Sequence, residues 1–165
     1  MKIDDDHMYH GAALIQIAEH PEFTAINSAK LKGVVQENTF QVNQSVAIHL
    51  KYASKPNKAH SEYVFTFHKH HLQMLKALEQ KSDKVFIGLV CVEARQICCI
   101  SHRELEDLIA TREAKKGAPE DQYTLLVTVP SGKQFRVYMN APGQKKTSIG
   151  SFTVPRNAFP GCIFS

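Results

Sequence analysis

Three stretches of the chain space their apolar residues as α-helices do. The first is residues 8–20, which Pro21 follows as a stop signal. Its two apolar rows are Leu14, Ile17 and Ala18, and Met8, Ala12 and Ile15. We expect this helix to be mostly buried, with the aspartates at residues 4–6 capping its first turn and favouring the positive end of the helix dipole.

The second and third predicted helices lie further along the chain. A leucine stripe marks the second, which ends near Gln80: Leu72, Leu75 and Leu78. The third opens at a capping-box sequence, because Ser101 and Glu104 are spaced so that each side chain can bond the other's backbone amide. Gly117 ends this helix.

Shorter stretches have the patterns of β-strands. Residues 38–53 contain strand-like stretches with one buried face, and a turn at residues 55–58 leads to a strand over residues 63–67. Residues 85–92 are apolar without alternation, which indicates a central strand covered on both faces. Three further strands are expected at residues 97–100 and in a hairpin of residues 123–129 and 134–140.

The order of these elements predicts an α+β fold with about three helices and a mixed or largely antiparallel sheet. We expect residues 1–165 to form a single globular domain. Residues 141–165 are predicted to be an irregular tail that packs along it, with a mobile loop at residues 143–150.

Composition favours an ordinary globular protein, with 43% hydrophobic and 22% charged residues. The longest apolar run is far shorter than the ~20 residues of a membrane-spanning helix, so we expect no membrane contact. The acidic N-terminal residues lack the pattern of a secretory signal. We therefore expect a cytoplasmic protein whose four cysteines are reduced thiols.

Cysteine and histidine are the first candidates for chemistry. Cys91 and Cys98 are expected to face each other across a hairpin as buried structural thiols, and no base can be assigned to Cys162. Three histidines crowd the start of the second helix: His68, His70 and His71. No recognised motif supplies the further ligands that zinc prefers, so we predict a surface or partly buried cluster and no metal site.

The net charge of +4 is unevenly distributed. Residues 28–81 carry eight lysines and three acids, and residues 122–165 carry five basic residues and no acid. Basic residues that share a face bind nucleic-acid phosphates in a salt-sensitive way that is indifferent to sequence. The candidate phosphate-binding residues are Lys51, Lys55, Lys58, Lys69, Lys145 and Lys146.

The order of helix, strands, helix and strand over about residues 8–93 resembles the core of the restriction-endonuclease-like PD-(D/E)XK nucleases. This resemblance implies a divalent metal held by acidic residues beside a lysine, with Glu19 as the helical acid and Lys51 as the lysine. Asn43 stands where the family has an aspartate, and His49 stands where it has the acid two residues before the lysine. The resemblance therefore implies a relative that binds nucleic acid without cleaving it.

Our working hypothesis is a non-catalytic, nucleic-acid-associated domain without a cofactor. Two alternatives stay open. One is a metal-dependent phosphodiesterase with Glu19, His49 and Lys51 as catalytic residues. The other is a protein-interaction or homo-oligomerising module that pairs through its aromatic C-terminal tail or an exposed strand edge.

Overall fold

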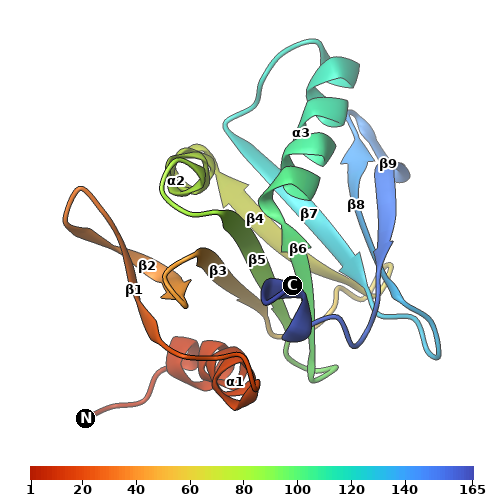
Figure 1. The fold of residues 1–165 in the computed structure, drawn as a ribbon. Helices are drawn as coiled ribbons and strands as arrows, with labels where there is room; N and C mark the ends of the chain where they lie inside the picture. The colour runs from red at the N-terminus through yellow and green to blue at the C-terminus, as the bar shows by residue number, and fades with distance from the viewer.

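The computed structural model describes the backbone of residues 1–165 and all side chains except those of residues 145 and 146. Its described elements are three α-helices and nine strands (Figure 1). The helices are α1 (Asp5–Glu19), α2 (Lys69–Glu79) and α3 (His102–Lys116). The strands are β1 (Ile26–Leu31), β2 (Val34–Val42), β3 (Val46–Ala53), β4 (Glu62–His68), β5 (Lys84–Cys91), β6 (Gln96–Ser101), β7 (Gln122–Thr128), β8 (Phe135–Ala141) and β9 (Gln144–Val154). The predicted α+β class with about three helices is confirmed. None of the described helices is both long and apolar enough to cross a bilayer.

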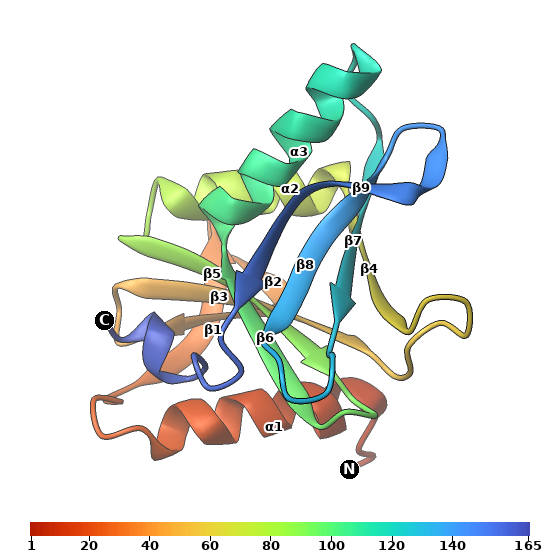
Figure 2. The same cartoon turned by 90° about the vertical axis from the view of Figure 1, so that its right-hand side faces the viewer.

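The strands form two sheets where the sequence predicted one. The first has the order β1-β2-β3-β5-β6, with β3 and β5 parallel and the other neighbours antiparallel. The second has the order β4-β7-β8-β9 and is antiparallel. Figure 2 shows α1 at one end of the molecule and α2 and α3 at the other. β4 pairs with β7 in the second sheet and with no strand of the first. Alternation along a single strand does not specify which strand it pairs with.

The first sheet separates two hydrophobic cores. One core fills the space between this sheet, the second sheet, α2 and α3, and the other lies under α1 and the C-terminal residues. β5 serves both cores, since Ile87 and Leu89 are buried in the first and Val90 in the second. The prediction of a central strand covered on both faces is therefore confirmed.

The sequence predicted the buried face of α1 only in part. His10, Ala13 and Ile17 are buried, whereas Met8 and Ile15 are each 61% exposed. The apolar row assigned to Met8 and Ile15 is therefore wrong. The buried row starts with His10, and a pattern of apolar residues does not include histidine. The aspartate cap is confirmed, because the side chain of Asp4 accepts a hydrogen bond from the His7 amide at 3.0 Å.

The C-terminal segment is more regular than expected. Residues 144–154 form β9, which pairs with β8, where we had expected a mobile loop and an irregular chain. Phe159 and Ile163 are buried in the core beside α1. The Phe164 ring stacks on His20, with 4.3 Å between ring centroids. Phe159 and Phe164 of the C-terminal segment thus pack against the rest of the domain.

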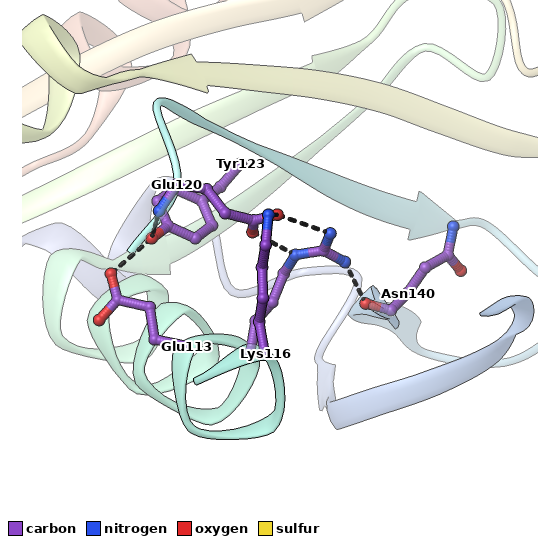
Figure 3. A network of polar contacts seen from close by, with 6 residues as sticks. Glu113, Lys116, Glu120, Tyr123 and Asn140 are labelled. Carbon is purple, nitrogen blue, oxygen red and sulfur yellow. Dashed lines mark hydrogen bonds and ion pairs between the residues drawn. The ribbon is translucent and has the colours of Figure 1, made fainter. Parts of the chain in front are cut away.

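A polar network fixes the end of α3 (Figure 3). Arg112 donates two hydrogen bonds to the Glu120 carboxylate, at 2.6 and 3.0 Å, and one to the Asn140 carbonyl at 2.6 Å. The bond from Arg112 holds the pKa of Glu120 down at about 2. Glu113 accepts a hydrogen bond from the Tyr123 hydroxyl. Glu113 thus has a structural partner in Tyr123.

The strand cysteines are buried thiols. Cys91 pairs with Gln96 and Cys98 pairs with Leu89, so the two cysteines are diagonal neighbours and do not face each other directly as expected. Burial raises the pKa of Cys91 to about 12 and also raises that of Cys98. Both thiols therefore resist forming the reactive thiolate.

Candidate functional site

A gap opens between β2 and β3 where their pairing ends. The two strands pair from Val42 and Val46 as far as Thr39 and His49. The next residue of β2, Asn38, has φ of 55°, a left-handed conformation that asparagine tolerates better than most residues. Beyond this point β2 continues along β1 only, while β3 runs on to its last residue. The edge of β3 after His49 is therefore left open.

A cleft of about 470 Å³ lies at this gap. Its walls come from α1, β2, β3, β4 and α2, which are brought together from both sides of the first sheet. The polar side chains that give it chemical character are His10, Asn38, His49, Lys51, His70 and His71. Asp6 and Glu37 supply carboxylates to the same wall.

His49 is held neutral in one tautomer by its neighbours. The Thr39 hydroxyl lies 2.8 Å from His49 Nδ1 and donates its single proton to the Glu37 carbonyl, also at 2.8 Å. His49 Nδ1 must therefore carry the proton that it donates to Thr39. Burial, together with nearby Lys51, lowers the pKa of His49 to about 3. Its Nε2 thus carries a lone pair, and that atom is buried with no hydrogen-bond partner among the described residues.

His10 repeats this arrangement from α1. Its Nδ1 lies 3.2 Å from Asn38 Oδ1, an acceptor, so Nδ1 is the protonated nitrogen. Burial lowers the pKa of His10. Its Nε2 is likewise buried and has no hydrogen-bond partner in the described part of the chain. Two residues that line the cleft therefore each carry a buried imidazole nitrogen without a described hydrogen-bond partner.

Lys51 supplies the cationic group of the cleft. The side chain is half-buried, and its Nζ lies 5.0 Å from the centroid of the Phe67 ring. Burial lowers the pKa of Lys51 because the charged form loses hydration. No described carboxylate forms an ion pair with it. The cation–π contact offsets only part of that loss, so a bound anion would be favoured here.

The histidine cluster at the start of α2 divides between the cleft and solvent. His71 is half-buried and its ring centroid lies 5.8 Å from that of His49, while His68 and His70 are exposed and stack on each other. Burial and the nearby Lys51 lower the pKa of His71 to about 4. Among the described residues, these three histidines do not belong to a group with converging ligand atoms.

Two residues that the resemblance singled out lie elsewhere. Glu19 is the last residue of α1, is exposed, and is not part of the cleft lining. Asn43 lies in the turn between β2 and β3, where its Oδ1 accepts bonds from the amide and hydroxyl of Thr24 and its Nδ2 donates to the Glu22 carbonyl. Asn43 therefore fixes a turn. Asn38 is the asparagine that faces His49 and Lys51 across the cleft.

Sequence reasoning found His49 and Lys51 and missed His10 and Asn38. His10 precedes Ala13 by three residues and Ile17 by seven, a spacing that places it on the buried helix face. That spacing is the signal that could have found it. Asn38 is set apart only by its backbone conformation and the strand divergence, which the sequence does not display.

The candidate lysines are placed unequally. Lys51 lies in the cleft, and Lys55 and Lys58 are exposed on the connection that leads from β3 to β4. Lys69 is exposed at the start of α2 and lines a different groove, between α2 and α3. The side chains of Lys145 and Lys146 lie outside the described residues.

Comparison of the chain with protein-family models, with curated proteins and with solved structures found no match.

Proposed function

We propose that this protein binds nucleic acid without cleaving it, and that Lys51 holds a backbone phosphate in the cleft between β2, β3 and α2. The observation that carries the proposal is a half-buried ammonium group without a described carboxylate partner in a cleft of about 470 Å³. A phosphate oxygen would provide the missing opposite charge. Lys55 and Lys58 follow Lys51 along the chain and would contact neighbouring phosphates.

The side chains opposite Lys51 support binding without cleavage. Magnesium prefers several oxygen ligands, and nucleases that use it cluster carboxylates beside the lysine. Here a carboxamide, Asn38, and a neutral imidazole, His49, lie in that part of the cleft. Neither of these two side chains adds negative charge. The carboxylates of the cleft are those of Asp6 and Glu37, and among the described residues they belong to no group of converging ligand atoms.

Fluorescence anisotropy with short DNA and RNA oligonucleotides over 50–200 mM salt tests this proposal. We expect binding that weakens with salt, with a log–log slope of about −2 to −3 if roughly three phosphates are neutralised. Lys51→Met keeps the aliphatic stem over Phe67 but removes the charge. It should weaken binding roughly tenfold and reduce the slope by about 1.

Lys115→Met is the matched control, because Lys115 is exposed in the last turn of α3, far along the chain from the cleft elements. It should change affinity less than twofold. Binding without a salt slope, or equal losses in the Lys51 and Lys115 variants, would contradict a phosphate site at Lys51.

One observation favours a second candidate function, a metal-dependent phosphodiesterase. The unpartnered Nε2 lone pairs of His10 and His49 suit zinc, and each ring is oriented through its protonated Nδ1 as metal-bound histidines usually are. Asp6 and Glu37 line the same cleft, but their oxygens would have to move to join the two imidazoles, because among the described residues these side chains do not form a converging group of ligand atoms.

Labelled oligonucleotides incubated with the protein and magnesium, manganese or zinc distinguish the two functions. Cleavage that His49→Gln abolishes would establish the enzyme. Salt-sensitive binding with no cleavage under any of these metals would support binding and contradict the enzyme.

A further inference from the structure

A second polar cluster lies on the opposite side of α2 from the cleft. Glu79 is the last residue of α2, His102 is the first residue of α3, and Glu106 lies one turn further along α3. One ligand atom from each of these three side chains lies within 4.8 Å of the others. The cluster therefore joins the end of one helix to the start of another.

The contacts of His102 are not those of an ordinary ion pair. Its side chain is 2% exposed, and its Nδ1 lies 2.9 Å from Glu79 Oε1 and 3.6 Å from Glu106 Oε1. Nδ1 nevertheless makes no hydrogen bond, because the Glu79 oxygen lies off the direction of an N–H bond and the Glu106 oxygen is too distant. A buried ring nitrogen thus faces two carboxylates without a hydrogen bond to either, a costly arrangement unless another group lies between them.

The charges of the two glutamates are also uncompensated by basic side chains. Neither Glu79 nor Glu106 forms an ion pair with a lysine or arginine in the described part of the chain. The carboxylates remain 39% and 49% exposed, so an ion could reach them from solvent.

The separations of these atoms suit a single metal ion. Ligand atoms about 2.1 Å from one tetrahedral ion lie about 3.4 Å from each other. The two distances from His102 Nδ1, 2.9 and 3.6 Å, are on either side of that value. A metal ion on the axis of the Nδ1 lone pair can bind both carboxylates from positions off that axis, whereas an N–H bond needs an acceptor oxygen on it.

We propose that Glu79, His102 and Glu106 bind a divalent transition metal, of which zinc is the best fit. One nitrogen and two oxygen ligands suit zinc, and exposure of the carboxylates leaves a coordination position for water or an external ligand. The bound ion would tie the end of α2 to the start of α3 and stabilise their packing. The site is separate from the cleft and does not depend on the function proposed for it.

Isothermal titration calorimetry of the metal-free protein with zinc chloride tests this site. We expect saturable binding with a dissociation constant below about 10 μM and a rise of several degrees in the unfolding temperature at saturating zinc. Cobalt(II) in place of zinc should give a visible absorption spectrum typical of four-coordinate cobalt with nitrogen and oxygen ligands.

Conservative variants locate the ion without removing the buried imidazole. Glu79→Gln and Glu106→Gln should each weaken zinc binding at least tenfold. The double variant should show no rise in unfolding temperature when zinc is added. Asp107 is an exposed acid on the same helix, and Asp107→Asn should leave zinc affinity and the thermal shift unchanged. His49→Gln separates this site from the cleft and should also leave binding here intact.

The absence of zinc binding at 100 μM, or full retention of binding in the double glutamate variant, would overturn the site. Either result would leave His102 as a buried imidazole between two glutamates, without a metal ion. Loss of binding in His49→Gln alone would place the metal in the cleft instead.

Discussion

Phe67→Ala is expected to lower the free energy of unfolding by about 3–5 kcal/mol. The Phe67 side chain is fully buried in the core between the two sheets, and its ring also lies beneath the ammonium group of Lys51. Truncation removes apolar contacts and leaves a cavity that the paired strand β4 cannot close. Because domains of this size are stable by about 5–15 kcal/mol, the loss would be a large share of the total.

Urea denaturation followed by circular dichroism measures this loss. Val64→Ala is the control on the same strand, since Val64 is 43% exposed and its truncation should cost about 1 kcal/mol or less. A loss of 1 kcal/mol or less for Phe67→Ala would show that this core does not hold β4 as described.

Acidification from pH 6.5 to pH 5 should reduce the stability of the wild-type protein more than that of His49→Gln. The folded pKa of His49 is about 3 and its ordinary value is 6.5, so below pH 6.5 the unfolded chain binds a proton that the folded chain excludes. Stability from this residue is complete above pH 6.5 and is lost progressively as the pH falls towards 3. Over the interval to pH 5 the difference amounts to roughly 1.5–2 kcal/mol.

Unfolding free energies of both proteins at pH 5, 6.5 and 8 check this prediction. Between pH 6.5 and 8 the difference between the two curves should change by only about 0.4 kcal/mol in total, because His49 of the unfolded chain is half protonated at pH 6.5 and neutral at pH 8. Parallel curves down to pH 5 would show that His49 is not held neutral in the folded protein.

Local signals in the sequence predicted much of the fold correctly. The Ser101 and Glu104 side chains form the expected reciprocal cap, and Gly117 ends α3 with φ of 85°. These features depend on neighbouring residues, which is why the sequence displays them. The unbroken apolar run of β5 likewise predicted that this strand is buried on both faces.

Other features depend on contacts between distant segments. β1 buries only Ala29, so its residues lack the alternation that identifies a strand. β4 could have joined the first sheet by its pattern, and only pairing with β7 decides otherwise. The number of sheets was therefore not readable from the sequence.

The site was half predictable for the same reason. The resemblance singled out Lys51 and His49, and both lie on β3 two residues apart, hence on one face. The prediction of one buried face is wrong for β3, because residues 46–50 are buried on both faces. The partner residues come from other elements, and the sequence favoured Asn43 and Glu19 over Asn38 and His10. The strand divergence at Asn38 opens the edge of β3 after His49, and the cleft lies at this opening.

The most direct test of nucleic-acid binding in the cleft is a two-dimensional ¹H–¹⁵N NMR titration of the protein with the same oligonucleotides. We predict that the largest shift changes occur at Asn38, at Lys51 and its strand neighbours, and at Lys55 and Lys58, and that they reverse at high salt. Changes confined to the basic segment around Arg136 and Arg156, with the signals of Asn38 and Lys51 unmoved at saturation, would contradict a phosphate site in this cleft.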